Sequence, residues 1–164
     1  MKSTQHTSFE KERGVNDVHI DAEVAHIVVT LPAKKQTPDR HLDIYKGLGG
    51  AGMALRLVKM HPGGVSFAVD RPQFAEAQQI IRALGYQFEA ADDLVILAIT
   101  AVNMREMFGV MAKMAETLLN ASVETVQVGD AHDAVLVMVP GAQAETAVAA
   151  LRTAFALGPG GAGV

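Results

Sequence analysis

The order of predicted strands and helices repeats about halfway along the chain, and this repeat limits the fold more than any other feature. In the first half, apolar alternation and helical spacing predict six segments. They are strands at 24–31, 53–60, 65–69 and 86–90 and helices at 37–48 and 74–84. Their order along the chain is β-α-β-β-α-β.

The second half runs through the same order from residue 94. Its predicted strands lie at 94–102, 122–128 and 133–139, and its helical stripes run from Met107 to Leu118 and from Ala144 to Phe155. A final strand is missing from this half. The segment VNDVHI (15–20), near the start of the chain, alternates as a strand does. We expect this leading strand to complete the second unit.

Both units therefore have the split β-α-β pattern of a ferredoxin-like fold, an α+β class in which two helices cover one face of an antiparallel sheet. The predicted first domain spans 24–90, and the second combines 14–21 with 91–157. Asp92 and Asp93 mark the predicted linker between the two domains. We expect residues 1–13 to be a disordered N-terminus and 158–164 a flexible tail, because neither offsets an ordering cost of about 1–2 kcal/mol per residue.

The segment GLGGAG (47–52) fits the dinucleotide-binding pattern G-x-G-x-x-G, and Asp70 follows at about the distance of a ribose-binding acid. In a dinucleotide fold these glycines leave a strand and open a helix, so that the pyrophosphate meets the helix N-terminus. Here they follow a predicted helix and precede a predicted strand. A turn from helix to strand is therefore the preferred interpretation, and a nucleotide-binding enzyme that uses Gly47–Gly52 is kept as an alternative.

The composition of the 164 residues argues against several classes of function. A net charge of -4 with no basic cluster provides little of the positive field that binds nucleic acid. The longest apolar run, 94–102, is about half of the roughly 20 residues that cross a bilayer, so we expect a cytoplasmic protein without membrane contact. The chain has no cysteine and no zinc, P-loop or Ser-His-Asp pattern, so we predict no metal, no cofactor and no catalytic residues.

Four segments carry a resemblance to a known family. They are EVAHIVVTLP (23–32), VSFAVDR (65–71), AVNMREMFGVMAKMAETL (101–118) and AVAALRTAFALG (147–158). These segments resemble the tandem ACT domains at the regulatory end of aspartokinases, and the likeness runs from about Gly14 to Gly158. The chain looks most like the separate regulatory (beta) subunits of bacterial aspartokinases. The resemblance implies that the leading strand is lent to the second ACT domain.

The same resemblance implies a function. A chain of this kind is non-catalytic, binds a small amino acid of the threonine or lysine class at interfaces between ACT domains, and passes that state to an aspartokinase-like catalytic chain. The matching stretch for the family's first effector loop, Asp-x-Pro-Gly, is Gln36-Thr37-Pro38-Asp39, in which only the proline is retained. Lys59 and His61 stand where the family has a Gln-Asn pair, and Asn103-Met104-Arg105 resembles its Gly-Met-Arg.

These departures predict weak or absent binding of threonine and lysine. Gln36 offers an effector's ammonium group only a neutral dipole, roughly half as strong as a charge-assisted bond, and Asp39 repels a carboxylate. A second hypothesis is therefore a dimerising ACT scaffold that has lost effector binding and activates or stabilises a partner enzyme. We also expect a homodimer or a larger assembly, because segments 24–31 and 94–102 would be aggregation-prone if they were left as unpaired edge strands.

Overall fold

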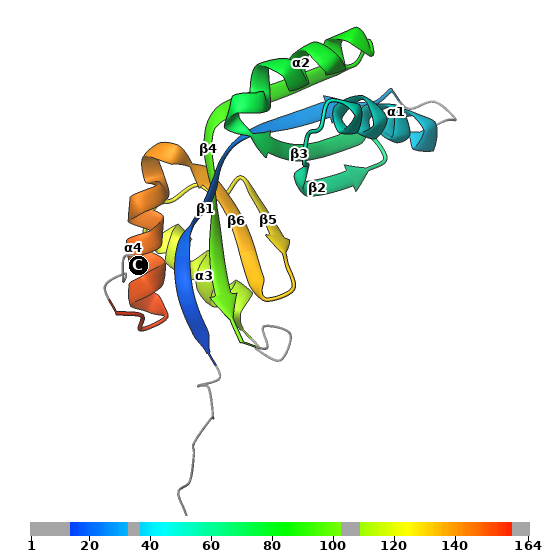
Figure 1. The fold of residues 1–164 in the computed structure, drawn as a ribbon. Coiled ribbons are helices and arrows are strands. Elements are labelled where there is room, and N and C mark those ends of the chain that lie inside the picture. The colour runs from blue at the N-terminus through cyan, green and yellow to red at the C-terminus, as the bar shows by residue number, and fades with distance from the viewer. Residues whose placement is uncertain (1–13, 33–36, 103–108, 159–164) are drawn as a thin grey trace, which may run out of the picture.

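A computed structural model describes residues 14–32, 37–102 and 109–158. In this part of the chain six strands form one antiparallel sheet in the order β2-β3-β1-β4-β6-β5 (Figure 1). The strands are β1 (Val15–Thr30), β2 (Arg56–His61), β3 (Gly64–Asp70), β4 (Gln87–Ala101), β5 (Gln127–Asp130) and β6 (Ala134–Pro140). The helices are α1 (Thr37–Gly50), α2 (Phe74–Ala83), α3 (Val110–Asn120) and α4 (Ala144–Ala154), and the short 3-10 turns η1 (Arg71–Gln73) and η3 (Gly141–Gln143) precede α2 and α4.

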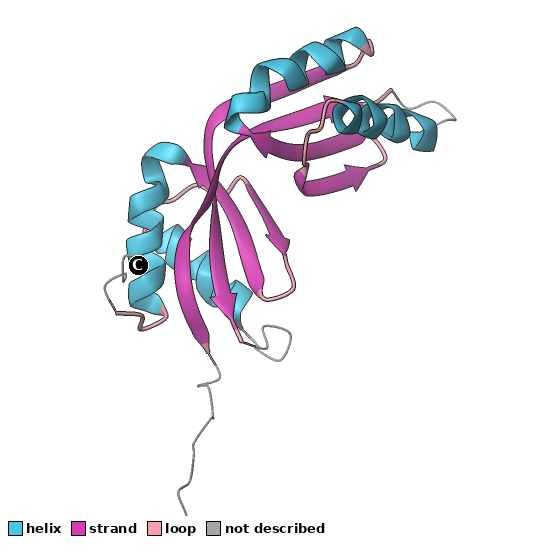
Figure 2. Ribbon diagram, viewed as in Figure 1, coloured by secondary structure: helices cyan, strands magenta, loops and turns pink. Residues whose placement is uncertain are grey.

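The helices cover the two ends of the sheet as separate pairs (Figure 2). Under α1 and α2, an apolar cluster joins Ile44 and Ile81 of the helices to Ile27 and Phe67 of the strands. A second cluster lies under α3 and α4 and includes Met114, Leu118, Leu151 and Leu97. Each pair packs on one face of its strands, because alternate strand residues point to the same face. The two ferredoxin-like units predicted from the repeat are thus confirmed.

The strands β1 and β4 are continuous, which corrects the prediction of separate strands joined by a linker. Asp92 and Asp93 lie inside β4, and the leading segment 15–20 runs directly into segment 24–30 within β1. The two strands pair antiparallel along their whole length, with register shifts between Ile20 and Ala22 and between Val24 and His26. Asp92 and Asp93 lie at the second shift, between the pairs Val24–Leu94 and His26–Ala91, and such a bulge lets the ladder bend while both strands continue. The first residues of β1 therefore lie beside the end of β4.

A third apolar cluster lies on the helix-free faces of the strands. It contains Val24, Ala68, Leu94, Ile96 and Met138, from β1, β3, β4 and β6. The segments 24–31 and 94–102, which would be aggregation-prone as unpaired edges, form the centre of the sheet, since β1 and β4 pair with each other and with β3 and β6. The edges are β2 and β5.

The glycine-rich segment ends a helix. Gly47, Gly49 and Gly50 lie in the last turns of α1, and Gly52 follows with a left-handed φ of 73°. The carboxylate of Asp70, the candidate ribose-binding acid, accepts a hydrogen bond from Arg56 Nε at 2.9 Å. The motif thus turns the chain from helix toward strand, as the element order predicts.

Two predicted strands begin later than expected. The strands predicted at 53–60 and 122–128 start at Arg56 and Gln127. Before each strand the chain turns a side chain into a core: Met53 is 6% exposed and Val123 is 7% exposed.

Among the described residues, no helix is long and apolar enough to cross a membrane.

Candidate functional site

A pocket of about 700 Å³ opens at the end of the first unit where β1 stops and β4 starts. Thr30 and Pro32 line it from the end of β1, and Tyr86 and Gln87 line it from the start of β4. The remaining lining residues come from the two helices: Asp39, Arg40 and Asp43 from α1, and Leu84 and Gly85 from the end of α2. The pocket therefore lies between the start of α1 and the end of α2.

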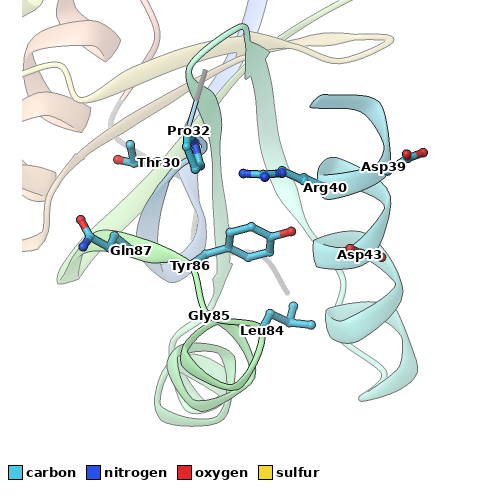
Figure 3. A pocket seen from close by; sticks show the side chains of 9 residues that line it. All are labelled: Thr30, Pro32, Asp39, Arg40, Asp43, Leu84, Gly85, Tyr86 and Gln87. Atoms are coloured by element: carbon cyan, nitrogen blue, oxygen red, sulfur yellow. The ribbon is translucent and has the colours of Figure 1, made fainter. Parts of the chain in front are cut away.

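The walls of this pocket are mainly polar: apart from Pro32, Leu84 and Gly85, its lining residues carry polar or charged side chains. In Figure 3 the Arg40 side chain extends from α1 across the pocket toward Pro32, and the Tyr86 hydroxyl points toward α1. Leu84 rises between the two helices, whereas the Asp39 carboxylate points away from Tyr86. Polar groups that converge on a pocket fix the orientation of a small molecule bound there.

Arg40 is the cation of the pocket. It forms no ion pair with another residue in the described part of the chain, although Asp39 and Asp43 lie on the same helix. A guanidinium group binds a carboxylate or phosphate through two parallel hydrogen bonds. The pocket is therefore suited to a small ligand with an anionic group, which can pair with Arg40. A cationic group of the same ligand can pair with Asp43.

The inner face of α1 holds this wall in place. His41 is buried, and its Nε2 donates a hydrogen bond to the carbonyl oxygen of Gly64 at 3.1 Å, since a carbonyl oxygen can only accept. Tyr45 lies one turn further along, and its buried hydroxyl has no hydrogen-bond partner among the described residues. Burial raises the pKa of the Tyr45 hydroxyl above its usual value, so the group stays neutral.

The predicted effector contacts are only partly brought together. Asp39 lines the pocket, whereas Lys59 and His61 are exposed on the edge strand β2 and are not among the lining residues. Thr37 and Pro38 begin α1, but their side chains are outside the described part. Gln36 and the segment Asn103-Met104-Arg105 also lie outside the described residues.

Sequence reasoning did not select Arg40, Asp43, Tyr86 or Gln87. Arg40 and Asp43 read as exposed positions of a short helix, and Tyr86 and Gln87 read as the start of a strand. The available signal was Gly85, whose left-handed φ of 80° turns the chain between α2 and β4 and so places Tyr86 opposite α1. No group of three metal-binding side chains occurs within the described ranges.

A family model for the ACT domain matches residues 89–153 of the chain. Residues 89–153 form an ACT domain. They include β4 from Glu89 onward, α3, the strands β5 and β6, and α4 as far as Thr153. No curated protein matches the chain in sequence.

Solved structures extend the ACT likeness over most of the chain. A chain in the crystal structure of aspartokinase alpha and beta subunits matches with 21% identity and a TM-score of 0.79, covering 87% of this chain and 99% of that one. The ligand-free regulatory subunit of aspartate kinase from Thermus thermophilus matches with 20% identity and a TM-score of 0.77, over the same shares. E. coli aspartokinase III in complex with lysine and aspartate matches with 14% identity and a TM-score of 0.69, over 89% of this chain and 34% of that one. The fold is thus that of tandem ACT domains, which confirms the resemblance.

Proposed function

We propose that this chain is a non-catalytic, cytoplasmic regulatory subunit that acts on an aspartokinase-like amino-acid kinase. The observation that carries the proposal is the extent of the structural match. The chain covers 99% of a separate aspartate kinase regulatory subunit but 34% of aspartokinase III. We also propose that the boundary between the two ACT units falls between residues 90 and 91, and that segment 14–21 belongs to the second unit.

A kinase assay tests this role directly. The chain, carrying an affinity tag, is used to capture partners from its native host, and the kinase activity of any captured enzyme is measured with and without added chain. We expect an amino-acid kinase whose rate, or whose response to an amino acid, depends on the chain. Capture of no such kinase, together with no effect on a purified aspartokinase catalytic chain, would contradict the proposal.

The proposed effector is a small amino acid of the threonine or lysine class, bound at the start of α1. Arg40 can pair with the carboxylate of an amino acid, and Asp43 with its ammonium group. Gln36-Thr37-Pro38-Asp39, Lys59, His61 and Asn103-Met104-Arg105 are the further contacts that the family resemblance suggests. Because Gln36 replaces a carboxylate and Asp39 adds a negative charge, the affinity of the unaltered chain for threonine or lysine is expected to be low.

Calorimetry with threonine, lysine and methionine measures this affinity. The double change Gln36→Asp with Asp39→Gly should raise the affinity about tenfold to a hundredfold, since a charge-assisted hydrogen bond contributes about 1.5–3 kcal/mol. Arg40→Met should abolish the binding that remains, whereas Lys46→Met, at an exposed α1 position outside the pocket lining, should not change it. Micromolar binding of threonine or lysine by the unaltered chain would show that the effector contacts are assigned to the wrong residues.

A dimerising scaffold without effector binding is the second candidate function. It is favoured by Gln36 and Asp39, which stand where the resembling family has Asp and Gly, so the chemistry of the loop that binds effectors in that family differs here while the fold persists. A scaffold would activate or stabilise the kinase equally with and without amino acids. The kinase assay therefore separates the two candidates.

We further propose that the chain associates as a homodimer through its edge strand β2. Val58 and Met60 of this strand are 45% and 62% exposed, and an exposed edge with apolar side chains favours pairing with a second chain. Met60→Lys should weaken the dimer, because a charge on an edge strand opposes pairing. Sedimentation at micromolar concentration measures the association, and a clean monomer of the unaltered chain would exclude it.

A further inference from the structure

One side chain of the second unit contacts three strands of the first. Gln127 lies at the start of the edge strand β5, and its Oε1 accepts hydrogen bonds from Ser66 Oγ at 3.1 Å and from His26 Nε2 at 3.2 Å. Its Nε2 donates to the carbonyl oxygen of Leu57. Because a backbone carbonyl can only accept, this last bond sets the orientation of the amide and requires His26 Nε2 to carry a proton.

The residues that receive Gln127 lie on the helix-free face of the first unit. Ser66 is 8% exposed on β3, and His26 is half-buried on β1, where its neighbour Ala25 faces the helices instead. A polar group in such surroundings is costly to leave without a partner. The side chains of Ser66 and His26 point from the first unit toward the second, and Gln127 is their hydrogen-bond partner there.

The third contact falls on an irregular point of the edge strand β2. Leu57 has a left-handed φ of 48°, and the β2–β3 register shifts between Arg56 and Lys59. A leucine disfavours this conformation, so it persists only where the surroundings support it. The second unit provides that support from β5: Gln127 binds the Leu57 carbonyl, and Gly129 lacks a Cβ that would lie 2.4 Å from Leu57 Cδ2.

We propose that Gln127 is the coupling residue between the two units, which holds the Leu57 bulge of β2 in place and links the conformation of that edge to β5. A change on β2, the strand that carries Lys59 and His61, would then reach the second unit through one amide. The proposal goes beyond the regulatory role proposed above, because it concerns the chain alone and is measured without a partner or an effector.

Hydrogen exchange on the full chain tests the coupling. The variants are Gln127→Ala and Gln127→Glu, which both lose the donor to Leu57, and Gln143→Ala as the matched control. Gln143 also uses its side chain to hold a backbone, accepting from the Glu124 amide at 2.8 Å, but both partners belong to the second unit. We expect the amides of residues 56–61 to exchange at least tenfold faster in both Gln127 variants, while those around Met114 and Leu118 keep their protection.

A titration of His26 by NMR provides a readout that general loosening would not produce. In Gln127→Glu the new carboxylate faces the imidazole, so the pKa of His26 should rise relative to the unaltered chain, whereas Gln143→Ala should leave it unchanged. If Gln127→Ala does not fold, the Gln127→Glu variant alone decides both measurements. Exchange in 56–61 no faster than in Gln143→Ala, or an unmoved His26 titration in Gln127→Glu, would overturn the proposal.

Discussion

Four residues in left-handed conformations show the internal repeat at the scale of single amino acids. Gly52 (φ 73°) follows α1 and Ser122 (φ 57°) follows α3, and in both cases the next amide donates to a helix carbonyl, Met53 to Leu48 and Val123 to Leu118. After α2 and α4 the same place is taken by Gly85 (φ 80°) and Ala156 (φ 55°). The exit from each helix therefore requires this conformation, whether or not a glycine supplies it.

This equivalence predicts opposite effects of exchanging glycine and alanine. Gly52→Ala should lower the free energy of unfolding by about 1 kcal/mol, because a Cβ disfavours the left-handed conformation by about 1–2 kcal/mol. Ala156→Gly should leave it unchanged or raise it by up to about 1 kcal/mol, since the relief of strain exceeds or balances the added entropy of the unfolded chain. Urea unfolding measures both variants.

Gly49→Ala serves as the control for this comparison. Gly49 lies inside α1 with nothing within 4 Å of an added Cβ, so alanine should stabilise the chain by about 0.5–1 kcal/mol. A loss of stability in Gly49→Ala similar to that in Gly52→Ala would show that the glycines do more than turn the chain.

At the scale of elements, one arginine fastens the first part of β1 to the last helix. Arg152 of α4 donates from Nη1 to Asp17 Oδ1 at 2.7 Å and to the Val18 carbonyl at 3.0 Å. Its Nη2 donates to the Gly158 carbonyl at 2.7 Å. The Arg152 side chain is only 18% exposed, so these bonds are partly shielded from water. The leading strand is thus held in the second unit by a helix that lies more than a hundred residues away in sequence.

Replacing this arginine should release the leading strand. Arg152→Met should lower the free energy of unfolding by about 1–3 kcal/mol, as expected for hydrogen bonds to a charged group. Arg82→Met is the matched control, because Arg82 lies at the end of α2, bonds Gln78 at an exposed site and stacks on Phe88. Arg82→Met should lower the free energy of unfolding by less than about 1 kcal/mol. Thermal and urea unfolding compare the two, and equal losses would contradict the anchoring role of Arg152.

At the scale of the whole molecule, the contact between the units introduces a dependence on pH. Burial lowers the pKa of His26 below its usual value of 6.5, partly opposed by the hydrogen bond with Gln127. At the other end of β1, burial raises the pKa of Asp17, but hydrogen bonds from Arg152 and His19 outweigh it and hold that pKa below 3.8. The two groups therefore act in separate ranges of pH.

The free energy of unfolding should fall in two steps on acidification. Below about pH 6.5 the unfolded chain protonates His26 more readily than the folded chain does, so stability declines until the folded His26 also titrates. Asp17 contributes its full share to the free energy of unfolding above about pH 3.8. This share is lost as the pH falls through the pKa of Asp17 in the folded chain, which lies below 3.8. Urea unfolding between pH 7.5 and pH 3 measures both steps. His26→Gln should reduce the upper step, and an identical upper step in that variant would refute the assignment.

Local pattern sufficed to predict the fold class. Periodic apolar residues such as Phe74, Ala77 and Ile81 determine which face of a helix is buried, and β-branched runs mark the central strands, because these signals depend only on neighbours in sequence. The glycine motif was also correctly interpreted as a helix exit. What could not be predicted is the continuity of β4 through Asp92 and Asp93, since two exposed aspartates resemble a linker unless the residues on both sides of them pair with the same partner strand, as Ala91 and Leu94 do with β1.

The sequence by itself determined two repeated units, their helices and the family they resemble, because each unit encodes its own core through local periodicity. Only the tertiary structure decided which groups meet across the chain: Arg40 with Tyr86 at the pocket, Arg152 with Asp17, and Gln127 with His26, Ser66 and Leu57. The residues that meet in these contacts are between 46 and 135 positions apart in the sequence. Polar contacts over such separations leave no periodic signal, because a single side chain at each end is enough to form them.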